Sequence, residues 1–283
     1  MNVVVTGSTG FLGSHIVAES EKQGHKVFRL KHSDVNNTNI FDDFSPDILV
    51  HCGWGGVSAV DRNDPELQKQ NVLYSDRVLA IYPFKQVIAL GSQDEYGFID
   101  EIVNEDHALK PLSEYAKAKI TFCEHLKNFA NTHNVIWQWL RIFNMYGTGQ
   151  SPNWLIPSVI KKCLAGEQEM QTTLGEQQYA YLFADDFARA IVSMFGKNNS
   201  GIYNISSSVP RPLRQIFNQI KKLTDSNISF EFGAIPYRQN QSMMICGDSS
   251  KFIDAFGDFE TTEFTIGLQK IIDEWKKKCL SCR

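Results

Sequence analysis

Short apolar runs alternate with amphipathic segments through the first half of the chain. The runs have the length and β-branched composition of buried strands; they lie at residues 2–6, 26–30, 47–52, 86–91 and 136–142. Segments with helical periodicity lie between them, at residues 11–23, 65–81 and 114–131. Strands that alternate with helices build right-handed βαβ units, so the pattern predicts an α/β fold with a doubly wound parallel sheet of the Rossmann type.

Three glycines follow the first strand, within the segment Thr6-Gly-Ser-Thr-Gly-Phe-Leu-Gly13. In such a turn Gly7 permits the tight bend, Gly10 lets backbone N–H groups approach a pyrophosphate, and Gly13 lets the helix pack closely. Glycine-rich turns also occur without a ligand, but here a strand precedes the turn and an amphipathic helix follows and ends at Gly24. We therefore expect the helix N-terminus to bind the phosphates of a dinucleotide.

The second half of the chain is less regular and predicts a smaller lobe. Its expected elements are helices and one short strand, at residues 154–165, 185–195, 202–205, 211–223 and 264–276. We expect residues 1–147 to form the dinucleotide-binding domain, completed by segments around 178–205. Residues 148–177 and 206–283 are expected to form a mixed α/β lobe that binds the substrate.

Tyr115 and Lys119 are four residues apart in a segment with helical character, so they share one helix face. A nearby ammonium and an oxidised nicotinamide both favour the phenolate, and the phenol can then exchange a proton with a carbinol oxygen. Such a pair also arises by chance on surface helices. Ser92 supports the catalytic interpretation because it ends the strand at 86–91, where parallel sheets bind ligands, although a serine can also simply cap a strand.

Composition and charge exclude several classes of protein. The 283 residues carry a net charge of −4, which argues against a nucleic-acid-binding protein. No apolar run is long enough to cross a membrane and no signal peptide opens the chain, so we expect a cytoplasmic protein. Four scattered cysteines fit buried free thiols, and the terminal Cys279 and Cys282 lack the further ligands of a zinc site, so no metal is expected.

Together these motifs resemble those of the extended short-chain dehydrogenase/reductases, the nucleotide-sugar epimerase/dehydratase superfamily. Further matching segments are Asp47-Ile-Leu-Val-His51, Asn71, Arg141-Ile-Phe-Asn144-Met-Tyr146-Gly147, Ala184-Asp185-Asp186, Gly201-Ile-Tyr203-Asn204-Ile205 and Gly267-Leu268. The resemblance implies an enzyme with the catalytic residues Ser92, Tyr115 and Lys119, the last also binding the nicotinamide ribose. It also implies a homodimer formed through the helix of Tyr115 and the preceding helix. The residues implied to line the dinucleotide are Gly7, Thr9, Gly10, Phe11, Leu12 and Gly13.

The end of the second strand bears on the choice of cofactor. Relatives that retain NAD place an aspartate there, whereas this chain has Lys31. A cation suits the 2′-phosphate of NADP, so we expect NADP(H), with NAD(H) possible; the alternative is a solvated surface lysine. Asn39 replaces another acidic residue of the family near the adenine and, with Ile40, is expected to contact the cofactor.

The residues around Ser92 separate the reactions known in the family. Its dehydratases carry an Asp-Glu pair after the Ser/Thr, but this chain has Gln93 and Asp94 there, and glutamine is no general acid. We expect a reductase of a nucleotide-activated 4-keto-6-deoxyhexose. A 4-epimerase with bound NAD and a non-catalytic dinucleotide sensor are the alternatives.

Four residues are expected on the nucleotide-sugar side of the site. Trp54 faces the sugar or nicotinamide unless it is a structural tryptophan, Gln93 and Asn144 lie at the sugar, and Arg238 binds the diphosphate unless it is a surface arginine. Tyr179 replaces an arginine that binds the diphosphate in many relatives.

Overall fold

The fold is taken from a computed structural model, which describes residues 1–37, 39–58 and 60–281 and, among these, side chains up to residue 278. The strands are β1 (Asn2–Thr6), β2 (Lys26–Leu30), β3 (Ile48–His51), β4 (Gln86–Ser92), β5 (Ile102–Val103), β6 (Ile136–Ile142), β7 (Asn144–Tyr146), β8 (Glu169–Thr172), β9 (Gln178–Phe183), β10 (Gly201–Ile205), β11 (Pro210–Pro212), β12 (Ser229–Phe232) and β13 (Met244–Gly247). The helices are α1 (Phe11–Lys22), α2 (Pro65–Ala80), α3 (Glu114–His133), α4 (Leu155–Leu164), α5 (Ala184–Ser193), α6 (Leu213–Thr224), α7 (Ser250–Phe256) and α8 (Phe264–Ser281). Short 3₁₀ turns are η1 (His32–Asn36), η2 (Asp61–Asn63) and η3 (Gln93–Tyr96).

The main sheet has six strands in the order β10-β6-β4-β3-β1-β2, and all five pairings are parallel. The predicted α/β fold of Rossmann type is thus confirmed. The order reverses at β1, which pairs with β2 on one side and with β3 on the other, so the chain crosses from one side of β1 to the other. Because the strands are parallel, the carboxyl ends of β1 and β4 lie at the same edge, where such sheets bind ligands.

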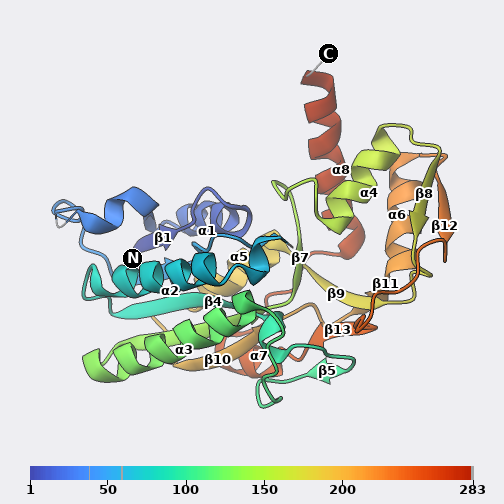
Figure 1. Cartoon of the computed structure of the whole chain (residues 1–283). Coiled ribbons are helices and arrows are strands. Elements are labelled where there is room, and N and C mark those ends of the chain that lie inside the picture. Colours follow the sequence, from blue (N-terminus) through green and yellow to red (C-terminus); the bar gives the residue numbers. More distant parts are fainter. Residues whose placement is uncertain (38, 59, 282–283) are drawn as a thin grey trace.

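Helices cover both faces of this sheet, as Figure 1 shows. On one face, Ile16 of α1 and Phe187 of α5 pack against Val3 and Val5 of β1. On the other face, helices α2 and α3 pack against the opposite side of the same strands. Because both faces are buried, the strands read as continuous apolar runs, which is why the sequence pattern identified them.

A second part of the molecule combines a small sheet with α4, α6 and α8 (Figure 1). Its five strands follow the order β11-β9-β13-β5, and β7 also pairs with β9; β8 and β12 form a separate pair. Ile160 of α4, Ile216 of α6 and Leu268 of α8 form the core of this part with Phe183 of β9.

Several elements of the second part escaped the sequence pattern. Strands β5, β7 and β11 have two or three residues, too few for a periodic signal. The helix expected at 211–223 begins only at Leu213, because Pro210–Pro212 pair with β9 as a strand. The domain boundaries stay a prediction. Strand β10 joins the main sheet, whereas β5 and β7, which precede residue 147, belong to the second sheet.

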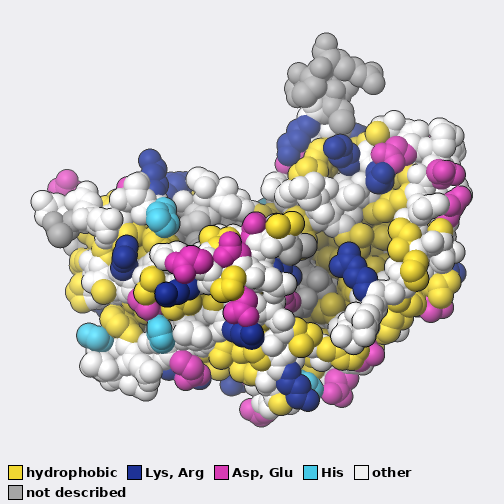
Figure 2. Space-filling model, viewed as in Figure 1, with side chains coloured by type: hydrophobic (Ala, Val, Ile, Leu, Met, Phe, Trp, Pro, Cys, Tyr) yellow, Lys and Arg dark blue, Asp and Glu magenta, His cyan; other side chains and the backbone are white. Residues whose placement is uncertain are grey.

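None of the helices in the described chain is long and apolar enough to span a membrane. The space-filling view shows a hollow between the sheet domain and the second part (Figure 2).

Candidate functional site

The turn between β1 and α1 has the geometry of a phosphate cradle. Gly7 has a φ of +62°, and the Gly10 N–H donates to its carbonyl oxygen at 2.9 Å. A Cβ at Gly13 would lie 2.1 Å from that same oxygen, so only glycine fits there. No side chain caps the first turn of α1, which leaves its backbone N–H groups for an anion.

Helix α3 brings two of the three predicted catalytic side chains to the end of β4. Ser113 caps the helix by accepting from the Ala116 N–H, and Tyr115 and Lys119 follow in its first two turns. Tyr115, Lys119 and Ser92 are 7%, 5% and 6% exposed. All three line one cavity of about 400 Å³, together with the glycine turn. The structure therefore brings the predicted catalytic residues together beside the phosphate cradle.

Lys119 is held from two sides. Its Nζ donates to the Leu90 carbonyl oxygen at 2.8 Å and lies 3.7 Å from the centre of the Trp54 ring. Burial lowers the pKa of Lys119 to about 7. Trp54 also meets the Tyr115 ring edge-on at 6.3 Å, so it lies beside the catalytic pair.

Tyr115 is protonated in this environment. Burial first, and then the Asp94 carboxylate, raise the pKa of the phenol, against a hydrogen bond with Ser92 and the Arg62 guanidinium. A neutral phenol is the form that can donate a proton to an oxygen bound beside it.

Buried charges fix the end of β4. Glu95, fully buried, accepts from the Ser92 N–H at 2.8 Å and from Arg141 Nε at 2.8 Å. The indole of Trp139 donates to the same carboxylate at 3.1 Å. Sequence reasoning missed Glu95 as a residue that holds Ser92, although its position three residues after Ser92 is the spacing of a capping box.

A second cavity, of about 340 Å³, lies at the other side of the glycine turn. Thr9 and Lys31 line it, and His32 stacks on Tyr74 with ring centres 4.3 Å apart. Asn39 and Ile40 are not among the described residues that line this cavity. Ile40 packs instead against the apolar cluster under α2, so contact of this pair with the cofactor stays a prediction.

Polar side chains also line the larger cavity on the side of the second part. Gln93 Oε1, Asn144 Nδ2 and Gln150 Oε1 are buried and have no partner within the described chain. Trp154 and Tyr181 line the cavity near them. These unused hydrogen-bonding atoms suit a polyhydroxylated ligand.

The predicted diphosphate ligand Arg238 is exposed and lies outside the cavities described here. Tyr179, which stands where relatives carry an arginine, accepts a hydrogen bond from Gln241 Nε2 at 2.7 Å. Contact of Arg238 with a substrate therefore stays a prediction. Cys282 and the side chain of Cys279 lie outside the described residues. No group of three or more potential metal ligands occurs in the described part of the chain.

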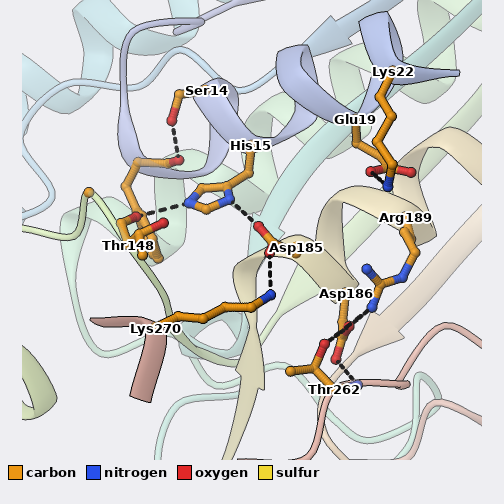
Figure 3. A network of polar contacts seen from close by, with 12 residues as sticks. Ser14, His15, Glu19, Lys22, Thr148, Asp185, Asp186, Arg189, Thr262 and Lys270 are labelled. Atoms are coloured by element: carbon orange, nitrogen blue, oxygen red, sulfur yellow. Dashed lines mark hydrogen bonds and ion pairs between the residues drawn. The ribbon is translucent and has the colours of Figure 1, made fainter. Parts of the chain in front are cut away.

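A polar network joins α1 to the loop after β7, to α5 and to α8 (Figure 3). His15 Nδ1 lies 2.7 Å from Asp185 Oδ1 and its Nε2 lies 2.9 Å from the Thr148 carbonyl oxygen. Lys270 of α8 reaches the same carboxylate at 3.3 Å. Burial acts to lower the pKa of His15, but its hydrogen bonds outweigh burial and raise it.

The chain is similar to known proteins in sequence and in fold. A model of the NAD dependent epimerase/dehydratase family matches residues 3–206. The chain is 24% identical to dTDP-6-deoxy-L-talose 4-dehydrogenase (NAD(+)) of Aggregatibacter actinomycetemcomitans, over 87% of this chain and 99% of the relative. UDP-glucose 4-epimerase of Thermotoga maritima, solved with UDP-glucose, has a TM-score of 0.89 at 23% identity, covering 99% and 100% of the two chains. RMD of Pseudomonas aeruginosa, solved with NADPH, has a TM-score of 0.84 at 20% identity, covering 98% and 99%.

Proposed function

Since the chain belongs to the NAD dependent epimerase/dehydratase family of enzymes, we propose that it reduces the 4-keto group of a nucleotide-activated 4-keto-6-deoxyhexose with NAD(P)H. The observation that carries this proposal is the convergence of Ser92, Tyr115 and Lys119 on one cavity beside the phosphate cradle. A relative of similar length is named for oxidation at carbon 4 of a nucleotide-linked 6-deoxy sugar, which is the reverse type of reaction.

The glycine turn fits the pyrophosphate of a dinucleotide. A Cβ at Gly7 would come within 2.9 Å of the Gly53 backbone, and one at Gly13 would lie 2.1 Å from the Gly7 carbonyl oxygen, so the turn accommodates no side chain at either position. No side chain caps the first turn of α1, which leaves its N–H groups for the phosphates. When bound, the reduced dinucleotide supplies hydride to the substrate carbonyl carbon.

The residues of the chain supply the proton and hold the oxygen. The Tyr115 phenol donates its proton to the oxygen at carbon 4 of the sugar, and the Ser92 hydroxyl holds that oxygen by a hydrogen bond. The Lys119 ammonium, when charged, favours the phenolate that the donation leaves. Gln93, next to Ser92, cannot protonate a leaving hydroxyl, which disfavours dehydration.

Lys31 supports NADP(H) as the preferred cofactor. It lies at the carboxyl end of β2 and lines the smaller cavity with Thr9 and Asn71. A cation at this point can pair with a 2′-phosphate, and it offers no acceptor to the free ribose hydroxyls of NAD. NADPH suits a reductase that draws on an external reductant in every turnover, whereas an epimerase regenerates its own NAD.

Turnover with and without the Tyr115 hydroxyl tests the proposal. We expect the wild-type protein to oxidise NADPH in the presence of a nucleotide-linked 4-keto-6-deoxyhexose, and to use NADH more slowly. Tyr115→Phe removes the proton donor and should lower kcat by about 100-fold or more. Oxidation followed at the nicotinamide absorption band measures both.

Tyr82→Phe is the matched control, because it removes a phenol hydroxyl outside the cavity and should leave turnover unchanged. Nearly full activity in Tyr115→Phe would contradict the mechanism. An epimerase would be identified instead if neither NADPH nor NADH were oxidised, NAD were released on denaturation, and 4-epimers were interconverted.

A further inference from the structure

Two charged side chains outside the predicted catalytic set, Arg62 and Asp94, line the larger cavity with Tyr115. The Arg62 guanidinium carbon is 4.7 Å from the centre of the Tyr115 ring. Arg62 also forms an ion pair with Asp94, and both residues line the larger cavity. Their side chains are 30% and 27% exposed, so the pair is mostly shielded from water. Sequence reasoning did not identify either residue as part of the site.

Both partners are fixed by their own segments. The Arg62 N–H donates to the Ser58 carbonyl oxygen at 3.1 Å, and Gln68 Nε2 holds the neighbouring Asp61 carbonyl oxygen at 3.3 Å. The Asp94 N–H donates to Ser92 Oγ at 3.2 Å. The ion pair therefore joins the segment after β3 to the turn that carries Ser92, with Tyr115 underneath.

Within the described chain, the Arg62 side chain contacts Asp94 and the Tyr115 ring. Its Nε is buried without a partner in the described chain, and its guanidinium carbon lies over the phenol ring. A cation on an aromatic face is attracted to the electrons of the ring. A phenolate ring carries more electron density than a phenol ring, so this contact strengthens as the proton leaves.

Four charged groups act on the Tyr115 phenol. Asp94 and Glu95, both from η3, disfavour the phenolate, and Arg62 from η2 favours it. Lys119, one turn along α3, has its Nζ 5.7 Å from the ring centre. Glu95 is buried and paired with Arg141, so its substitution would disrupt the core. Arg62 and Asp94 are therefore the two charged residues that can be substituted while the core is kept intact.

We propose that Arg62, anchored by Asp94, is a positioning residue that acts through Tyr115 and stabilises the negative charge that develops on its ring during proton transfer. The inference rests on the proposed role of Tyr115 as proton donor. It assigns opposite effects to two neighbouring side chains: Arg62 makes the proton easier to release, and Asp94 holds Arg62 in place while opposing release.

A spectroscopic titration of the phenol tests this inference without any sugar substrate. The phenolate absorption of Tyr115 is obtained as the difference between each protein and the same protein carrying Tyr115→Phe. It is measured with saturating NADP⁺ or NAD⁺, whichever binds more tightly, from about pH 6 to about pH 10. We expect Arg62→Gln to move the midpoint up and Asp94→Asn to move it down, each by about one pH unit.

The pH dependence of NADPH oxidation adds a second readout. Reduction requires the protonated phenol, so the alkaline limb of kcat should move in the same direction as each midpoint. Arg62→Lys keeps the charge and should restore most of the wild-type midpoint. Arg77→Gln, an exposed arginine on α2, is the control and should change neither readout.

The order of the two midpoints decides the outcome. A midpoint for Asp94→Asn below that for Arg62→Gln supports the inference. Coinciding midpoints, the reverse order, or no phenolate in either variant would overturn it, as would equal losses of activity at every pH. Because the titration needs no turnover, it can succeed even if the proposed reaction is wrong, and the two failures remain distinguishable. Circular dichroism of each variant confirms that it is folded.

Discussion

The hydrogen-bond partners of the buried His51 fix the protonation state and the tautomer of its ring. Ser75 donates its hydroxyl proton to the Asn71 carbonyl oxygen at 2.7 Å, so it accepts from His51 Nε2–H at 2.9 Å. Thr6 Oγ1 accepts from the Gly53 N–H and donates to His51 Nδ1 at 2.9 Å. The ring is therefore neutral with its proton on Nε2, and it links the end of β1 to helix α2.

This arrangement predicts a loss of stability in acid. Burial lowers the pKa of His51 from 6.5 to about 3, so between these values the unfolded chain binds a proton that the folded chain does not. The free energy of unfolding should therefore fall as the pH falls below 6.5, by up to about 1.4 kcal/mol per pH unit. His51→Asn should be less stable than the wild type near neutrality, and this deficit should shrink toward about pH 5.

Urea unfolding at several pH values measures the effect. His133→Gln is the control, because His133 is exposed near the end of α3, and its curve should run parallel to the wild type. A deficit of His51→Asn that stays constant with pH would show that His51 does not carry this dependence.

At the scale of elements, the cradle between β1 and α1 was predictable from the chain. Gly7, Gly10 and Gly13 indicate this turn from the local sequence alone, since each lies where a side chain would crowd the backbone of the turn or its neighbours. The structure places all three in the turn, as expected. Arg62 was not predictable, because its approach to Tyr115 depends on a segment after β3 that meets α3 only in the folded sheet. No spacing in the sequence reports such a contact.

Substitution of Gly13 tests whether the turn between β1 and α1 binds the cofactor. Gly13→Ala places a methyl group 2.1 Å from the Gly7 carbonyl oxygen, so the turn must open. We expect a loss of affinity for NADPH of about five- to 150-fold and a lower melting temperature, since such a strained contact costs about 1–3 kcal/mol. Calorimetric titration measures the affinity. Ser14→Ala, at the next and exposed position of α1, should bind NADPH like the wild type, and unaltered binding by Gly13→Ala would contradict the account of the turn.

At the scale of the whole molecule, the main sheet and its helices followed from apolar patterning, whereas the second sheet did not. Strands β5, β7, β9 and β13 come from distant parts of the chain, so their pairing depends on the tertiary fold and leaves no local pattern in the sequence. That second part supplies Asn144 and Gln150 to the larger cavity. Under the proposed function, the residues that would face the sugar therefore lie in the region that sequence patterns describe least well. The division into two domains and a homodimer through α3 stay predictions.

Transfer of label from the cofactor tests the central claim most directly. The protein is incubated with NADPH deuterated at the transferring position of the nicotinamide and a nucleotide-linked 4-keto-6-deoxyhexose, and the product is analysed by NMR. The proposed reaction predicts one deuterium at carbon 4 of the sugar for each NADPH consumed. A reduced sugar with no deuterium at carbon 4, or 4-epimers formed without consumption of NADPH, would contradict it.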